Sequence, residues 1–147
     1  MSQKELAKDY LTQSRLRLKT AKSVFKDEEA YAYCIRQSQE AVELALKSAL
    51  RLTGIDFPKW HDIGDFLIRE EDKFPEEFKE KIEKLASISE KLTALREPAM
   101  YGDESIDKAP SKLFKKEDAA HIIEQAEFCF NSVKELFKSF EKSTKNQ

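Results

Sequence analysis

Glycine and proline are scarce in this chain, with three and four residues among 147. Val, Ile and Thr together number 17, so the residues that favour strands and those that favour tight turns are both few. An all-β fold is therefore excluded. Because a typical domain has roughly 150 residues, the length predicts a single domain over residues 1–147.

Long apolar runs are also missing. The longest uninterrupted run covers the six residues 30–35, whereas a membrane-spanning helix needs about 20. The first ten residues, MSQKELAKDY, lack the apolar stretch of a signal peptide. These absences predict a soluble protein of the cytoplasm.

Cysteine and histidine each occur only twice. Cys34 and Cys129 form neither a CxxC pair nor a disulfide framework, and both fall on apolar helical stripes, so we expect buried, reduced thiols. His61 and His121 lie about 60 residues apart without metal-ligand spacing, and His121 falls outside the apolar stripe. With no glycine-rich phosphate loop either, the sequence predicts no metal and no cofactor.

What the chain does contain is apolar residues spaced three and four apart, which is the pattern of amphipathic helices. This pattern predicts an all-α fold, an antiparallel up-and-down bundle of four long helices plus one short helix. The long helices are expected over about residues 3–25, 28–53, 75–97 and from about 115, and the short helix over about 61–69.

Individual residues predict where these helices begin and end. Asp27 can cap the second helix and Gly54 can stop it. Pro75 fits the first turn of the fourth helix, and Pro98 should end or kink it. An exposed loop is predicted over about 102–114 and a frayed tail over about 142–147, because both segments lack apolar periodicity.

Two stripes of charge follow the first two predicted helices. The second helix places Arg36, Glu40, Glu43 and Lys47 within about 60° of one another, either as a solvated face with i,i+4 ion pairs or as a polar groove or subunit interface. The first helix carries six cations in one stripe, and residues 4–26 sum to +5, whereas residues 70–83 sum to −4. The basic stripe is either an ordinary solvated face or a surface that attracts phosphate.

The segment around Pro98 is the most unusual. Arg96 could hold a phosphate or carboxylate at two points, or it could bond the last carbonyls of its own helix. Tyr101 follows five positions later, which on an unbroken helix is about 140° away, so the two converge only if the proline breaks the helix. His61 could transfer protons or could pack the start of the short helix.

Three segments together carry a resemblance to a known family. QEAVELALK over residues 39–47, HDIGDFL over 61–67 and REPAMYG over 96–102 resemble a HEPN domain of the stand-alone archaeal or bacterial type. The resemblance covers roughly residues 5–140. It implies a helical bundle, usually a homodimer, from a family often encoded beside a minimal nucleotidyltransferase as a toxin–antitoxin pair.

Many members of that family are metal-independent ribonucleases that use an Arg and a His at the dimer cleft. Here Arg96 matches the Arg, Glu97 takes the polar position beside it, and Tyr101 stands where the His would be. A phenol with an ordinary pKa near 10 is a poor general base at neutral pH.

The resemblance therefore implies a dimeric nucleotide- or nucleic-acid-binding module and partner of a nucleotidyltransferase. Its ligand-binding residues would be Glu43, Lys47, Arg96, Glu97 and Tyr101. If the partner adenylylates the chain, Tyr101 is the expected acceptor. The alternative is a ribonuclease toxin in which Arg96 stabilises charge on the scissile phosphate while Tyr101 or His61 assists proton transfer.

Overall fold

Four long amphipathic helices form because apolar side chains recur along one side of each segment. The computed structural model describes residues 3–56 and 62–145. The long helices are α1 (Gln3–Val24), α2 (Tyr31–Leu52), α5 (Ile82–Tyr101) and α7 (Lys116–Lys145). The shorter elements in the described residues are α3 (Ile63–Arg69), η1 (Glu71–Lys73), α4 (Glu76–Lys79), η2 (Glu104–Ile106) and α6 (Pro110–Leu113).

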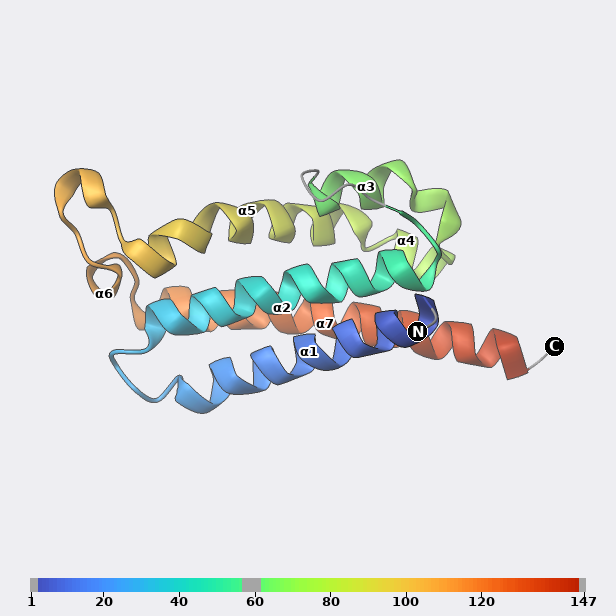
Figure 1. Ribbon diagram of the computed structural model, residues 1–147, viewed down its shortest axis with the longest axis horizontal. Helices are drawn as coiled ribbons and strands as arrows, with labels where there is room; N and C mark the ends of the chain where they lie inside the picture. The colour runs from blue at the N-terminus through green and yellow to red at the C-terminus, as the bar shows by residue number, and fades with distance from the viewer. Residues whose placement is uncertain (1–2, 57–61, 146–147) are drawn as a thin grey trace.

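The long helices alternate in direction along the chain. In Figure 1, α1 and α5 run one way along the long axis, and α2 and α7 run the other way. The predicted all-α, antiparallel up-and-down bundle with its additional short helix is thus confirmed. No helix among the described residues is long and apolar enough to cross a membrane.

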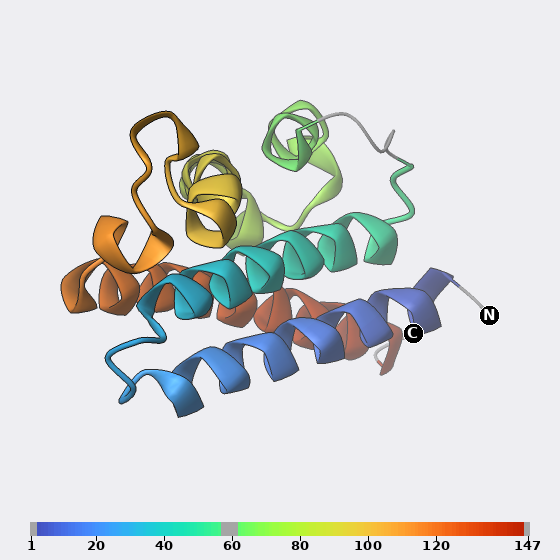
Figure 2. The ribbon, with the colours of Figure 1, turned by 60° about the vertical axis from the view of Figure 1, so that its left-hand side comes forward.

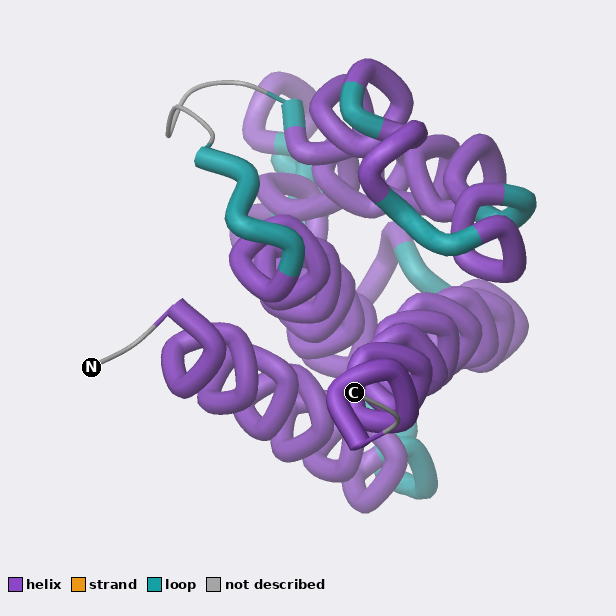
Figure 3. Tube along the Cα trace, turned by 90° about the vertical axis from the view of Figure 1, so that its right-hand side faces the viewer, coloured by secondary structure: helices purple, strands orange, loops and turns teal. Residues whose placement is uncertain are grey.

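Helix α2 lies at the centre of the bundle. Figures 1 and 3 place the α3–α5 segment on one side of α2 and place α1 on the other side, with α7 completing the packing around it. More than half of the residues of α2 are buried, among them Ile35, Val42 and Leu46. Because α2 contacts α1, α5 and α7, its packing joins the two layers of the molecule.

Small side chains allow α1 and α2 to pack closely. Two buried serines bind the helices together, since Ser14 Oγ donates to the Ala41 carbonyl at 2.7 Å and Ser48 Oγ donates to the Ala7 carbonyl at 2.7 Å. Buried hydroxyls need such partners, because a buried polar group without a hydrogen bond is costly. The alanines beside them leave room for the approach of the two backbones.

Both cysteines lie in the core, as predicted. Cys34 on α2 donates its thiol to the Ala21 carbonyl at 3.2 Å, and Cys129 on α7 is fully buried. Burial raises the pKa of both thiols, that of Cys129 to about 12. A buried thiol with a raised pKa is an inert packing residue.

The turn between α1 and α2 differs from its prediction. Helix α2 begins at Tyr31, and its preceding residue Ala30 makes no side-chain cap. Asp27 instead accepts a hydrogen bond from the Glu29 backbone N–H at 2.9 Å and so folds the turn itself. The prediction that Asp27 caps the second helix is therefore wrong.

The predicted fourth helix is interrupted. Helix α4 ends at Lys79 and α5 begins at Ile82, with a tight turn in which the Lys81 N–H donates to the Phe78 carbonyl at 2.9 Å. Phe78 and Ile82 are both buried in the core on either side of this turn. The interruption thus changes the direction of the chain while both apolar residues stay inside.

Pro98 does not end α5, which continues to Tyr101. The following segment is also more ordered than a plain loop, because it contains η2, an antiparallel bridge between Asp103 and Lys108, and α6. Helix α7 extends to Lys145, past residue 142, where the sequence predicts fraying. Figure 2 shows the α5–α6 connection folding back beside the start of α7.

The short helix α3 is capped by Asp62. The Asp62 carboxylate accepts a hydrogen bond from the Gly64 backbone N–H at 2.9 Å, which satisfies a free donor of the first turn. The buried residues Ile63, Phe66 and Leu67 hold the helix against the bundle. His61, the candidate for proton transfer at this helix start, lies outside the described residues.

Candidate functional site

Helix α5 carries both Arg96 and Tyr101 without a break between them. Five residues at 100° each place the two side chains about 140° apart around the helix. Because the helix is not broken at Pro98, the side chains of Arg96 and Tyr101 do not converge within one chain. Both side chains are exposed, Tyr101 to 59%.

Arg96 lies on the side of α5 that faces α2. Met100 is one helical turn further along the same side, and its sulfur accepts a hydrogen bond from Arg36 Nη1 of α2. The contact between Met100 and Arg36 fixes the register of α5 against the antiparallel α2. Arg96 lies four residues before Met100 and Glu40 lies four residues after Arg36, so Arg96 and Glu40 are at the same level along the two helices. Arg96 thus lies beside the polar stripe of α2.

The polar stripe of α2 is held by ion pairs. Glu40 pairs with Arg36 at 3.3 Å and with Arg17 of α1 at 2.8 Å, and Glu43 pairs with Lys47 at 3.3 Å. The four stripe side chains are 19 to 35% exposed. Both predicted i,i+4 pairs are present, yet the stripe is half-buried between α1 and α5, unlike an ordinary solvated face.

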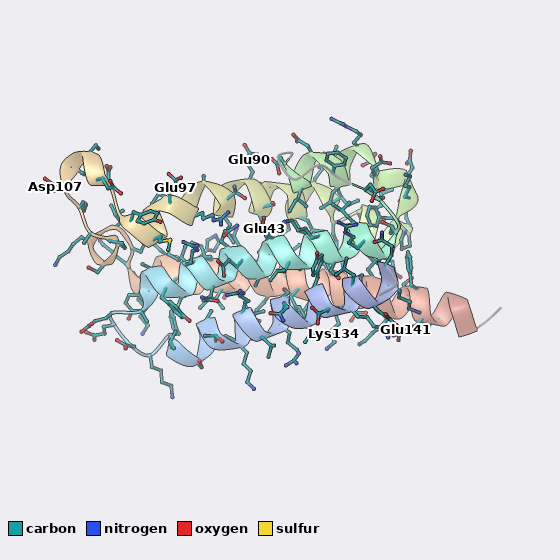
Figure 4. All side chains as sticks on the ribbon, in the orientation of Figure 1. Glu43, Glu90, Glu97, Asp107, Lys134 and Glu141 are labelled. Carbon is teal, nitrogen blue, oxygen red and sulfur yellow. The ribbon has the colours of Figure 1, made fainter. Side chains whose placement is uncertain are left out.

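A hollow of about 200 Å³ adjoins this stripe between α1 and α2. Gln37 lies in it and accepts a hydrogen bond from Arg17 Nη1 at 3.3 Å. We call the polar stripe of α2 together with Arg96 the α2–α5 polar face, which comprises Arg36, Glu40, Glu43, Lys47 and Arg96, and the hollow lies beside it. Figure 4 labels Glu43 between the ribbons of α2 and α5.

Glu97 and Tyr101 belong to a different place. They line a cavity of about 640 Å³ between the end of α5 and the α6 segment. The cavity is also lined by Leu95, Pro98, Gly102, Asp103, Glu104, Leu113 and Phe114. Three of its lining side chains are carboxylates and none is basic, so its electrostatic potential disfavours a phosphate.

The structure therefore divides the five predicted ligand-binding residues into two groups. Glu43, Lys47 and Arg96 share the α2–α5 polar face, whereas Glu97 and Tyr101 line the acidic cavity. Helix continuity through Pro98 causes the division, because it turns Tyr101 away from α2.

Arg17 and Met100 were not singled out by the sequence, although both contact the polar stripe. Arg17 flanks the apolar face of α1, at about 60° from the buried residue Ser14 when the helix is projected down its axis. An arginine at the border of an apolar helix face could have predicted a contact with a neighbouring helix.

The two histidines contribute little to a site that can be described. His121 is exposed on α7, as predicted, and His61 lies outside the described residues. In residues 3–56 and 62–145, no three His, Cys, Asp or Glu side chains are grouped so that they could hold a metal ion.

These features define an all-α antiparallel bundle whose central helix carries an ion-paired polar stripe. A model of the HEPN domain matches residues 7–136, and the chain therefore belongs to the HEPN domain family, as its three segments predict. The family supports nucleotide or nucleic-acid binding as the general class of function.

A solved structure is similar in fold. The crystal structure of TT1696 from Thermus thermophilus superposes with a TM-score of 0.65 at 24% sequence identity. The match covers 88% of this chain and 96% of that one. No curated protein matches the chain.

Proposed function

We propose that this protein binds a phosphate-bearing nucleotide or nucleic acid at its α2–α5 polar face. The observation that carries the proposal is Arg96, an exposed guanidinium that forms no ion pair with the described residues. Its neighbour Arg36 is already oriented by Glu40. A guanidinium without a carboxylate partner is the group best suited to bind phosphate at two points.

The charge of the surface supports the same ligand. In the α2–α5 polar face, Arg36, Lys47 and Arg96 against Glu40 and Glu43 give three positive charges and two negative charges, or +1. The whole chain has a net charge of −2, so this face is positive relative to the molecule. Half-burial of the stripe also strengthens the attraction, because screening by water is weaker there.

The proposed active form is a homodimer that pairs through this side of the molecule. Three large apolar side chains are exposed there, with Leu16 41%, Tyr33 46% and Met100 51% accessible. Apolar side chains around a partly buried charged centre are typical of protein interfaces. A second copy would bury them and enclose the polar face in a cleft.

The proposed partner of the dimer is a minimal nucleotidyltransferase. Tyr101 supports this role, since its phenol lies at the edge of an open cavity and is 59% exposed. In adenylylation, the phenol oxygen would bond to the α-phosphorus of ATP, pyrophosphate would leave, and the phenolic proton would pass to solvent. Mass spectrometry of the protein purified from its own cells would then find a nucleotidyl adduct on Tyr101.

Arg96→Ala tests the binding proposal. With a fluorescent ATP analogue as the probe, we expect the variant to bind about tenfold or more weakly, because hydrogen bonds between charged groups are lost. Arg69→Ala is the matched control, since Arg69 is an exposed arginine at the end of α3. Circular dichroism should show equal helicity in all three proteins.

Equal affinity of wild type and Arg96→Ala for the probe would remove Arg96 from the site. Arg96→Lys refines the result, because it keeps the charge and loses the two-point geometry. An intermediate affinity is expected for this variant.

The same proteins test the ribonuclease alternative. Incubation with mixed cellular RNA in a chelator should leave the RNA intact, because the only described candidate for proton transfer, Tyr101, faces away from Arg96. Cleavage that disappears in Arg96→Ala would establish the ribonuclease and overturn this expectation.

A further inference from the structure

A basic surface on the outer side of α1 is not used by the proposed site. Five of its residues lie within a 60° sector of the helix, and a sixth, Lys26, follows in the turn after α1. All six side chains are exposed. We call this surface the α1 basic face, which comprises Lys4, Lys8, Arg15, Lys19, Lys22 and Lys26.

Helix α7 extends this surface. Lys22 pairs with Glu127 of α7 at 2.9 Å, and this contact sets the relative register of two antiparallel helices. Arg15 lies seven residues before Lys22 on α1, and Lys134 lies seven residues after Glu127 on α7. Because the two helices are antiparallel, Arg15 and Lys134 are at the same level. Figure 4 labels Lys134 at the side of the bundle where α1 and α7 lie together. Lys134 therefore adds a cation at the middle of the face, whereas the same register brings Glu141 level with Lys8 and adds a carboxylate near its end.

The surroundings leave this positive charge largely uncompensated. Without Arg17, which pairs with Glu40 on another side of α1, residues 4–26 carry six cations and two carboxylates, or +4. Lys22 is the only one of the six cations with an ion pair to a described residue. The acidic segment 70–83, with a charge of −4, lies in the α3–α4 region on the other side of α2 (Figures 1 and 3). The molecule is thus strongly polarised although it is nearly neutral.

We propose that the α1 basic face binds the phosphate backbone of a nucleic-acid strand. This inference rests on the proposed function for the class of partner, but it assigns the backbone to a different surface from the Arg96 site. Successive cations on α1 are four, seven, four and three residues apart, which is about 4.5 to 10.5 Å along the helix. The face spans about 27 Å from Lys4 to Lys22. A single strand laid along the helix would therefore meet five cations over that length.

The same observations disfavour a membrane surface. An amphipathic helix that binds lipid inserts its apolar face, whereas the apolar face of α1 is buried against α2 through Ala7, Leu18 and Ala21. None of the six residues of the face is aromatic, so no bases would stack on it. The expected binding is therefore independent of sequence and strongly dependent on salt.

The experiment compares two triple variants of equal net charge. Lys8→Glu/Arg15→Glu/Lys19→Glu reverses three charges of the face. The control variant, Lys91→Glu/Lys112→Glu/Lys116→Glu, reverses three exposed lysines elsewhere. Fluorescence anisotropy with a labelled 30-nucleotide poly(U) RNA is measured from 50 to 200 mM salt, and circular dichroism checks that each variant is folded.

We expect the variant of the face to bind RNA about tenfold or more weakly than the control variant. The slope of log affinity against log salt concentration should become less steep by about 2. Each contact with a single strand releases about 0.7 counterion, and the variant loses three such contacts. Equal affinity and equal slope for the two triple variants would overturn the proposal. Binding of wild type to phosphatidylserine vesicles but not to the RNA would also overturn it.

This design distinguishes a failure of the Arg96 site from a failure of the α1 basic face. The α1 variant should bind the fluorescent ATP analogue like wild type, because Arg96 is unchanged. Arg96→Ala should retain the RNA salt slope, because the α1 basic face is unchanged. Loss of ATP-analogue binding in the α1 variant would show that the two surfaces are one site and would contradict the separate assignment.

Discussion

Cys129 shows how a buried residue in this bundle makes stability depend on pH. Its side chain is fully buried on α7, and desolvation disfavours the thiolate. The folded protein therefore keeps the thiol protonated up to a pKa of about 12, whereas the unfolded chain loses the proton near the ordinary value of 9.0. Because the folded pKa is raised, the associated stability is present below pH 9 and is lost as pH rises toward 12.

Cys129→Ala tests this linkage. The substitution leaves a small cavity and should lower the free energy of unfolding at pH 8. Above pH 9, the difference between wild type and variant should narrow by about 1.4 kcal/mol per pH unit, because only wild type releases this proton on unfolding. Urea unfolding at pH 8, 9 and 10 measures the difference, and parallel stability curves would contradict the pKa of about 12.

At the scale of the element, the ends of α2 and α5 provide a matched pair of glycines. Gly54 and Gly102 both have φ of +75°, a conformation that other residues rarely adopt. An added Cβ at Gly54 would meet nothing within 4 Å, whereas at Gly102 it would clash with the Lys108 carbonyl oxygen. The second glycine thus permits the close return of the chain after α5.

Gly54→Ala should cost about 1 kcal/mol of unfolding free energy, from backbone strain alone. Gly102→Ala should cost about 3 kcal/mol or more, because the clash with Lys108 adds to the strain and opens the Asp103–Lys108 bridge. Chemical denaturation compares them directly. Similar losses in the two variants would show that the α5–α6 turn adapts without cost.

The four long helices were predictable because each has an apolar stripe of sufficient length. The interruption before α5 was not, because residues 76–85 are mostly good helix formers and local propensity gives no reason for a break. The burial of Phe78 and Ile82 on either side of the turn fixes its position, which is a tertiary effect. Asp27 was misassigned because the same side chain suits both a cap and a turn.

The candidate site was predictable residue by residue but not as an arrangement. The stripe of α2 and its i,i+4 pairs follow from helical spacing. The separation of Arg96 from Tyr101 depends on whether α5 passes through Pro98. It does so with Ala99 buried in the core, and burial of that kind offsets the hydrogen bond that proline cannot donate.

At the scale of the whole molecule, the exposed apolar side chains beside the polar face predict a dimer. Light scattering at micromolar concentration should give twice the mass of the chain. Tyr33→Glu should shift the protein toward monomer, because a charge would be buried in the interface. Ile68→Glu is the control, since Ile68 is exposed to a similar extent, 45% against 46%, but lies on α3. A wild-type monomer would count against a shared cleft.

The position of α2 between two layers has a consequence for hydrogen exchange. Helix α5 packs mainly on α2 and α3, and α1 and α7 pack on the other sides of α2. The α3–α5 layer can therefore open locally while the rest of the bundle stays folded, and its amides should exchange first. A ligand held between Arg96 and the stripe of α2 would close that route, so protection of the α5 amides would report occupancy without any label on the ligand.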